Sequence, residues 1–146
     1  RKMDYVIASV HRHSFADAAT PAECTELYCN ALQNKKVLIL GHIGRSGLPF
    51  EIDPVLLAAR DLHKLIEINE HSLDVRNHCG ERCRQILKRC AELSVPISIS
   101  SDAHFATAIG KFDKVNKMLA EIHFPEELIA TRSKESFLSA MKMAGL

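Results

Sequence analysis

The feature that most constrains the fold of this chain is a fourfold alternation of short apolar runs with longer amphipathic stretches. The runs lie near residues 4–10, 37–41, 65–69 and 97–100 and are rich in Val, Ile and Leu. Short, nearly continuous apolar runs are typical of buried parallel strands, and their alternation with helices predicts right-handed crossovers. We therefore expect an α/β fold with four consecutive parallel strands and helices packed outside them.

Helix signals follow each run. Thr20, Pro21 and Glu23 have the order of an N-cap, a first-turn proline and a capping-box acid, so a helix is expected to begin there. Further helices are expected from Asp53-Pro54 to residue 63, over 81–93 and 114–122, and from Ser133 to a stop at Gly145. Residues 126–129 are expected to form a short turn or strand.

Composition limits the classes of protein to which the chain can belong. Its 146 residues, 47% of them hydrophobic, suffice for one core but fall short of a complete barrel, which needs roughly 200 residues or more. The 19 basic and 18 acidic residues are interspersed, which argues against nucleic acid as a partner, and no apolar run predicts a membrane span. Five cysteines without a secretion signal predict a reducing, cytoplasmic setting. Cys79 and Cys83 are interpreted as half-buried helix positions and not as a zinc pair.

Polar residues stand at the end of every predicted strand. The first strand ends at His11, the second at His42, the third at residues 69–71 and the fourth at Asp102 and His104. Carboxyl ends of parallel strands share one rim, and imidazole and carboxylate groups together suit zinc, manganese or iron. This favours a metal-dependent hydrolase over an α/β domain with incidental histidines. The alternative for the fourth strand end is that Asp102 caps a helix while His104 lies in solvent.

Two loops next to these strand ends carry further candidates. His71, Arg76 and His78 follow the third strand, and the Arg76 guanidinium could bind a phosphate, although a solvated loop explains these residues equally well. Residues 44–47 contain two glycines but lack the lysine and the spacing of a P-loop. We interpret them as a mobile loop beside the site.

Four segments together resemble a known family. Residues 4–11, 40–42, 66–69 and 100–104 are similar, in order and spacing, to the last four strand-end motifs of the polymerase-and-histidinol-phosphatase (PHP) superfamily. The spacing is most similar to that of small stand-alone bacterial PHP phosphoesterases, and the resemblance covers essentially all 146 residues. It implies the last four strand-helix units of a distorted (β/α)7 barrel. Residues 1–146 would then be the C-terminal part of a single PHP-type barrel domain.

The resemblance also implies roles for individual residues. His11 and His42 match the two histidines that hold one divalent metal, Asp102 matches a ligand of a second and His104 a ligand of a third. Zinc, manganese or iron would supply hydroxide for hydrolysis of a small phosphomonoester, such as a histidinol-phosphate-like molecule, without a side-chain nucleophile. Asn69 matches a position near the metals that is not a direct ligand. We keep it, with Arg76, as a substrate-binding candidate.

The chain departs from the family at its beginning. PHP domains start with a His-x-His strand and carry a further histidine and a bridging glutamate before the position of His11, whereas only ten residues precede His11 here. By itself the chain is therefore expected to be weakly active or inactive, and to pair with a separate N-terminal part or form a homo-oligomer. Two alternatives stay open: a non-catalytic module or truncated fragment derived from a PHP domain, and an amidohydrolase-type metal hydrolase.

Overall fold

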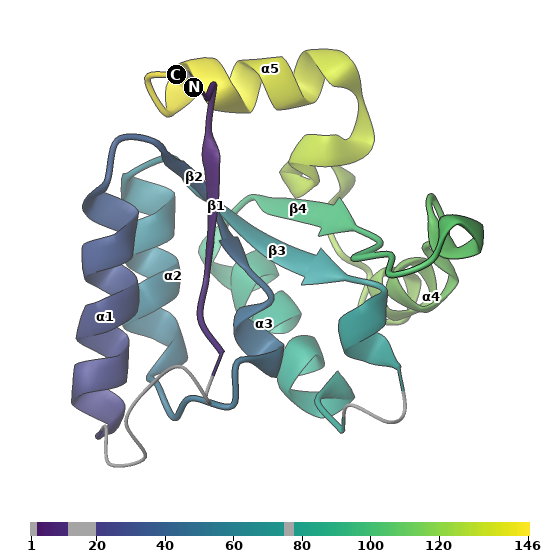
Figure 1. Cartoon of the computed structure of the whole chain (residues 1–146), viewed down its shortest axis with the longest axis horizontal. Helices are drawn as coiled ribbons and strands as arrows, with labels where there is room; N and C mark the ends of the chain where they lie inside the picture. Colours follow the sequence, from purple (N-terminus) through teal and green to yellow (C-terminus); the bar gives the residue numbers. More distant parts are fainter. Residues whose placement is uncertain (1–2, 12–19, 75–77) are drawn as a thin grey trace.

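The computed structural model describes residues 3–11, 20–74 and 78–146 of the chain. Four strands, β1 (Val6–Ser9), β2 (Val37–Gly41), β3 (Leu65–Asn69) and β4 (Ile97–Ser100), form one sheet in the order β1-β2-β3-β4. Every neighbouring pair is parallel, and helices connect the strands (Figure 1). The predicted set of four parallel strands is confirmed, with β1 shorter than the apolar run that predicted it.

Three helices, α1 (Pro21–Gln33), α2 (Ile52–Asp61) and α3 (Gly80–Leu93), pack against one face of the sheet (Figure 1). Their inward side chains and the facing strand residues form the main core, in which each fully buried leucine or isoleucine contributes about 1.5–3 kcal/mol. Its fully buried members include Leu32, Leu56, Ile86, Leu87, Ile66 and Ile97. The predicted capping box opens α1, where the Thr20 side chain accepts from the Glu23 N–H.

Two further helices follow β4 in the chain. α4 (Asp113–Glu121) lies beyond the carboxyl end of β4, and α5 (Lys134–Met143) crosses the amino ends of the strands (Figure 1). Phe137 of α5 packs edge-on against Tyr5, with ring centroids 5.6 Å apart. The carboxyl ends of the strands, where the predicted metal ligands lie, are therefore left uncovered by α5.

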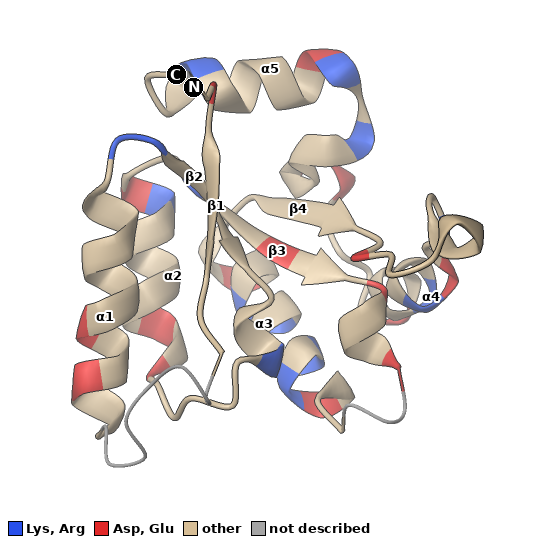
Figure 2. Ribbon diagram, in the orientation of Figure 1, with Lys and Arg blue, Asp and Glu red and all other residues tan. Residues whose placement is uncertain are grey.

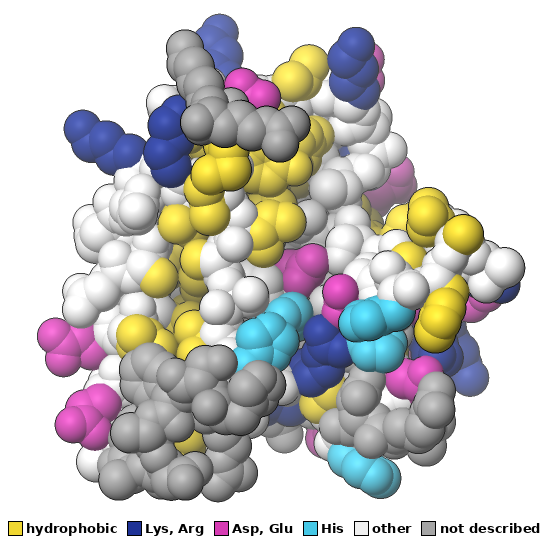
Figure 3. Space-filling model, viewed as in Figure 1, with side chains coloured by type: hydrophobic (Ala, Val, Ile, Leu, Met, Phe, Trp, Pro, Cys, Tyr) yellow, Lys and Arg dark blue, Asp and Glu magenta, His cyan; other side chains and the backbone are white. Residues whose placement is uncertain are grey.

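The second face of the sheet carries none of the helices α1, α2 and α3 and is partly exposed: Ile7 is 48% exposed, whereas Ile39, Glu67 and Ser98 are buried. Ile7 and Ile39 lie on it next to the polar Glu67 and Ser98, around a hollow of about 390 Å³. Figure 3 shows hydrophobic side chains gathered on this face. In a closed barrel this face would point inward. The predicted barrel nevertheless stays a prediction, because the four described strands form an open sheet with β1 and β4 at its edges.

The predicted ends of some elements needed correction. α2 begins at Ile52, just before the predicted Asp53-Pro54 start, and ends before residue 63. The segment predicted as a turn or strand is a 3-10 turn, Glu126–Leu128, followed by a single parallel bridge between Ile129 and Ile97. Helices α2, α3 and α4 end with residues in the left-handed region, which glycine usually occupies. These residues are His63, Ser94 and His123.

Charged residues of both signs are interspersed over the helices and the loops between elements, as the composition predicted (Figure 2). One acidic residue, Glu67, lies within a strand, β3, at the centre of the sheet (Figure 2). None of the helices in the described part of the chain combines the length and the apolar character that a membrane span needs.

Candidate metal centre

The structure brings the predicted ligands to one end of the sheet. The rings of His11 and His42 lie with their centroids 4.8 Å apart, although the two residues follow different strands. A second ring pair, His71 and His104, has a centroid distance of 4.6 Å. Figure 3 shows two groups of histidine side chains with a basic side chain between them, and a further histidine apart from both. The predicted clustering of strand-end residues is thus present in the fold.

His42 is held in an unusual backbone conformation. Its φ of 34° lies in the left-handed region, and its N–H donates to Oε2 of Glu67 over 2.8 Å. Residues other than glycine adopt this backbone conformation at an energetic cost, and such strained residues concentrate at functional sites. Unlike His63 and His123, His42 does not end an α-helix. His42 instead precedes the 3-10 turn Ile43–Arg45, and its carbonyl accepts the Arg45 N–H over 2.8 Å.

One ring nitrogen of His42, Nδ1, is buried and has no hydrogen-bond partner in the described part of the protein. Burial, and secondly the positive charge of Arg45, lower the pKa of His42 below its ordinary value. This shift favours the neutral ring, which is the form that coordinates metals.

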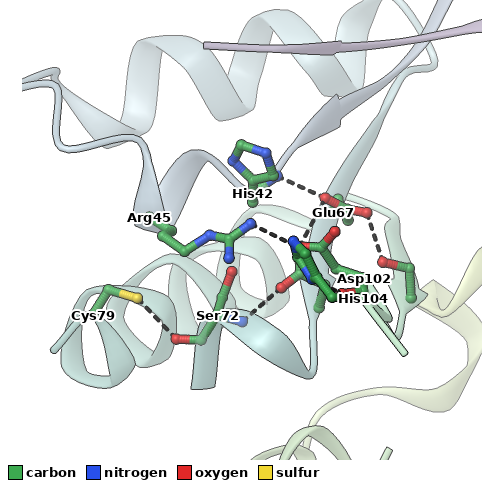
Figure 4. A network of polar contacts seen from close by, with 9 residues as sticks. His42, Arg45, Glu67, Ser72, Cys79, Asp102 and His104 are labelled. Atoms are coloured by element: carbon green, nitrogen blue, oxygen red, sulfur yellow. Dashed lines mark hydrogen bonds and ion pairs between the residues drawn. The ribbon is translucent and has the colours of Figure 1, made fainter. Parts of the chain in front are cut away.

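Glu67 fixes the geometry of this region from inside the sheet. Its side chain accepts hydrogen bonds from the His42 N–H, from Oγ of Ser100 at 2.6 Å and from Nδ2 of Asn69 at 3.3 Å (Figure 4). The residue is only 7% exposed, and a buried carboxylate is tolerated when donors satisfy it. An acidic residue inside an otherwise apolar strand was the sequence signal for this role, but it did not identify the partners.

Asn69, a predicted substrate-binding residue, is fully buried. Besides its bond to Glu67, its Oδ1 accepts the Ser72 N–H over 2.7 Å and so holds the 3-10 turn His71–Leu73. Both hydrogen bonds point into the protein. Asn69 is thus placed under the turn that carries His71 and supports it. Arg76, the other predicted substrate-binding residue, lies outside the described residues.

Three side chains form a compact group next to His42. One ligand atom from each of His71, Asp102 and His104 can be chosen so that all three lie within 4.8 Å of one another. Asp102 also has a left-handed backbone, with φ of 48°. Its carbonyl oxygen lies 3.0 Å from Nδ1 of His104, so a proton on Nδ1 leaves the Nε2 lone pair for a metal.

His71 was not among the predicted ligands. The sequence placed it in a loop that faces the rim, where an ordinary solvated position was equally compatible. Its spacing was the overlooked signal, since it follows the last residue of β3 by two positions, as Asp102 follows the last residue of β4. Parallel register places Asn69 beside Ser100, and this brings the two following segments together.

The neighbouring loop is anchored by Glu70. Its carboxylate accepts the N–H groups of Lys114 and Val115 at 3.0–3.1 Å, in the first turn of α4. The negative charge satisfies free helix N–H groups and complements the helix dipole. This contact fixes α4 beside a pocket of about 360 Å³. The pocket wall includes His71, Asp102, His104, Phe105, Lys111 and Lys114.

Arg45 is the basic residue of the site. It ends the 3-10 turn Ile43–Arg45 after β2, and its Nη2 lies 2.5 Å from Oδ2 of Asp102 (Figure 4). The sequence predicted a mobile loop over residues 44–47. The structure instead shows a hydrogen-bonded turn, in which Oγ of Ser46 donates to the Ile43 carbonyl and accepts the Leu48 N–H.

This turn is packed against helix α3 through Gly44. A Cβ added at Gly44 would lie 2.7 Å from Sγ of Cys83, closer than side chains approach one another. Cys79 and Cys83, predicted as half-buried helix positions, are instead both buried, and Cys79 lies just before the first residue of α3. Burial raises the pKa of the Cys83 thiol to about 12. All five cysteines are free thiols. The pair thus packs the base of the Arg45 turn.

We expect Gly44→Ala to lower the free energy of unfolding by about 1–3 kcal/mol, because the added methyl group overpacks the contact with Cys83. Urea unfolding monitored by circular dichroism measures the change. Gly80→Ala is the matched control, since a Cβ there meets nothing within 4 Å, and it should be neutral or slightly stabilising. Equal stability of the two variants would contradict the expectation.

Comparison with known proteins finds relatives that are named as probable phosphatases. A probable phosphatase of Caldicellulosiruptor bescii is 37% identical over 145 residues, which cover 99% of this chain and 60% of the relative. Probable phosphatases of Acetivibrio thermocellus and of Clostridium botulinum strain Hall are each 36% identical, covering 94% and 99% of this chain and 56% and 59% of the relatives. The chain is similar to probable phosphatases over nearly its whole length.

The chain spans about 60% of the length of these curated relatives. The activity of the full-length relatives is therefore not assigned to this chain on the similarity alone. No family model matches the chain, so its membership of the PHP superfamily stays a prediction.

Proposed function

We propose that this chain carries part of the active site of a metal-dependent phosphoesterase that hydrolyses small phosphomonoesters. The observation that carries the proposal is the meeting of His11, His42, Asp102 and His104 at one end of a parallel sheet. The similarity to probable phosphatases supports the same reaction class.

The residues present fit a divalent metal. Imidazole and carboxylate groups are ligands for zinc, manganese and iron, and the buried Nδ1 of His42 lacks another partner in the described part of the chain. His11 and His42 would hold one ion, while Asp102 and His104, with His71 beside them, would contribute to others. A bound dication supplies Lewis-acid activation of water and of the phosphoryl group near neutral pH.

The remaining groups of the site prepare these ligands. Glu67 fixes the backbone of His42, and the carbonyl of Asp102 orients the His104 ring. The pocket beside His104 offers Phe105 and Lys111 to the alcohol part of a substrate. Its volume of about 360 Å³ suits a small molecule. A histidinol-phosphate-like compound is one candidate substrate.

The site is proposed to be completed by residues outside this chain. The relatives extend beyond the matched region by about 40% of their length, and PHP domains carry further histidines and a glutamate ahead of the position of His11. The second face of the sheet and the free edge of β1 would adjoin that part. A homo-oligomer that covers the same edge is the alternative arrangement.

We expect the full-length protein, stripped of metal by a chelator, to regain hydrolysis of p-nitrophenyl phosphate when zinc or manganese is added back. Release of p-nitrophenol measures the activity, and chelated protein without added metal is the control. If neither metal raises turnover above that control for any of a panel of phosphomonoesters, the non-catalytic module becomes the better account.

A further inference from the structure

We infer that Arg45 binds the phosphate of the substrate, and that Asp102 holds its guanidinium at the site until a metal and the phosphate arrive. This inference rests on the proposed function, because it concerns a subsite of the same centre. It assigns a role to a residue that the strand-end pattern did not indicate.

The position of Arg45 is the first argument. Its turn follows β2 immediately after His42, and its side chain reaches across to Asp102 after β4 (Figure 4). The guanidinium therefore lies between the His11–His42 pair and the His71–His104 pair. A phosphate located between the two groups of ligands would lie within the reach of this side chain.

The hydrogen bonding of Arg45 is the second argument. Among the described residues, its guanidinium has a hydrogen bond to Asp102, made by Nη2. A guanidinium carries several N–H donors in a planar fork that matches phosphate oxygens. The side chain as a whole is only 19% exposed. A phosphate would supply acceptors beyond the Asp102 carboxylate that the described residues offer.

The Arg45–Asp102 ion pair differs from other arginine ion pairs of the protein in its burial and its position. Arg84 pairs with Glu121, and Arg89 with Asp53, between neighbouring helices, and their side chains are 30% and 36% exposed. Exposed pairs of that kind contribute about 0–1 kcal/mol to stability. Arg45 instead pairs with a residue that follows β4, at the carboxyl ends of the strands, and its ion pair does not link two helices.

Electrostatics supplies the third argument. A permanent cation next to metal ligands repels dications, and the Arg45 guanidinium lies 2.5 Å from Oδ2 of the proposed ligand Asp102. A purely structural Arg45 would therefore lower the metal affinity of a site whose other residues suit a metal ion. A phosphomonoester is a dianion at neutral pH, so a cation next to the metals lowers the energy of the bound substrate and of the charge that develops on it.

The inference makes two predictions of opposite sign. A divalent metal competes with Arg45 for the carboxylate of Asp102, so Arg45→Gln should bind zinc as tightly as the wild type or tighter. The same variant should bind inorganic phosphate about tenfold to a hundredfold more weakly in the zinc-loaded state, because a charge-assisted hydrogen bond is lost. The phosphate affinity of Arg45→Lys should lie between those of the wild type and Arg45→Gln, since an ammonium keeps the charge but not the planar fork of donors.

The experiment uses the full-length protein and needs no turnover. Zinc affinity is measured by competition with a chromophoric chelator, and phosphate affinity by isothermal titration of the zinc-loaded protein. Arg84→Gln, which removes a surface ion pair, is the matched control and should change neither affinity. Retained zinc binding with weakened phosphate binding in Arg45→Gln supports the inference.

Three results would overturn it. Unchanged phosphate affinity in Arg45→Gln would show that the guanidinium does not touch the phosphate, and absence of phosphate binding in the wild type would remove the subsite. A parallel loss of zinc and phosphate affinity would make Arg45 a structural residue. A wild type that binds zinc and phosphate but hydrolyses no phosphomonoester contradicts the proposed function and leaves the phosphate subsite intact.

Discussion

Replacing His42 by alanine in the full-length protein is expected to lower kcat for p-nitrophenyl phosphate about a hundredfold or more, with little loss of stability. The ring offers a buried, partnerless Nδ1 and a depressed pKa, both of which suit a ligand more than a packing residue. Asp102→Ala is expected to act similarly through a neighbouring ion. Steady-state kinetics at saturating zinc or manganese, with metal content measured in parallel, provides the test.

The control for His42 is His63→Ala. His63 also has a positive φ, but it ends α2 and lies away from the strand carboxyl ends, so its removal should leave kcat unchanged. Similar kinetics for the wild type and for His42→Ala, at equal metal content, would remove His42 from the active site. Loss of activity in both histidine variants would point to a general loss of folded protein.

The second large effect is expected from Glu67→Ala, which should lower the free energy of unfolding by about 2–5 kcal/mol. The change leaves the His42 N–H, the Ser100 hydroxyl and the Asn69 amide without their shared acceptor inside the protein. Because the His42 backbone is strained, losing its hydrogen bond should also displace the ring and reduce metal affinity. Urea unfolding and zinc titration measure the two effects.

Glu67→Gln separates charge from shape at this position. Its amide retains one oxygen acceptor and nearly the same volume, so it should be less destabilising than alanine while still weakening the bond to either His42 or Ser100. If alanine and glutamine variants both unfold at the same urea concentration as the wild type, the network around Glu67 does not hold the site together.

Local patterns in the sequence predicted the elements of the fold. Residues 37–41, 65–69 and 97–100 were predicted as strands and are strands, because a short apolar run bounded by turn residues specifies its own conformation. The Thr20 capping box likewise involves residues only three positions apart. The strand-end placement of His11 and His42 followed from the same local reasoning, and parallel pairing then brought their rings together.

The contacts that shape the site are of a different kind. Arg45 and Asp102 are separated by 57 positions, Glu67 and Ser100 by 33, and no local pattern links such pairs. Their meeting depends on the register between β3 and β4 and on the close contact of Gly44 with Cys83. Neither is encoded by the spacing of residues along one element.

The sequence by itself therefore determined which residues lie at the ends of strands, since strand periodicity and turn chemistry act over a few residues. Only the tertiary structure decided that His71 joins Asp102 and His104, that Asn69 points inward and that Arg45 faces the centre. The physical reason is that these side chains are positioned by burial and by hydrogen bonds to partners distant in sequence. Such partners are chosen when the sheet and its helices pack.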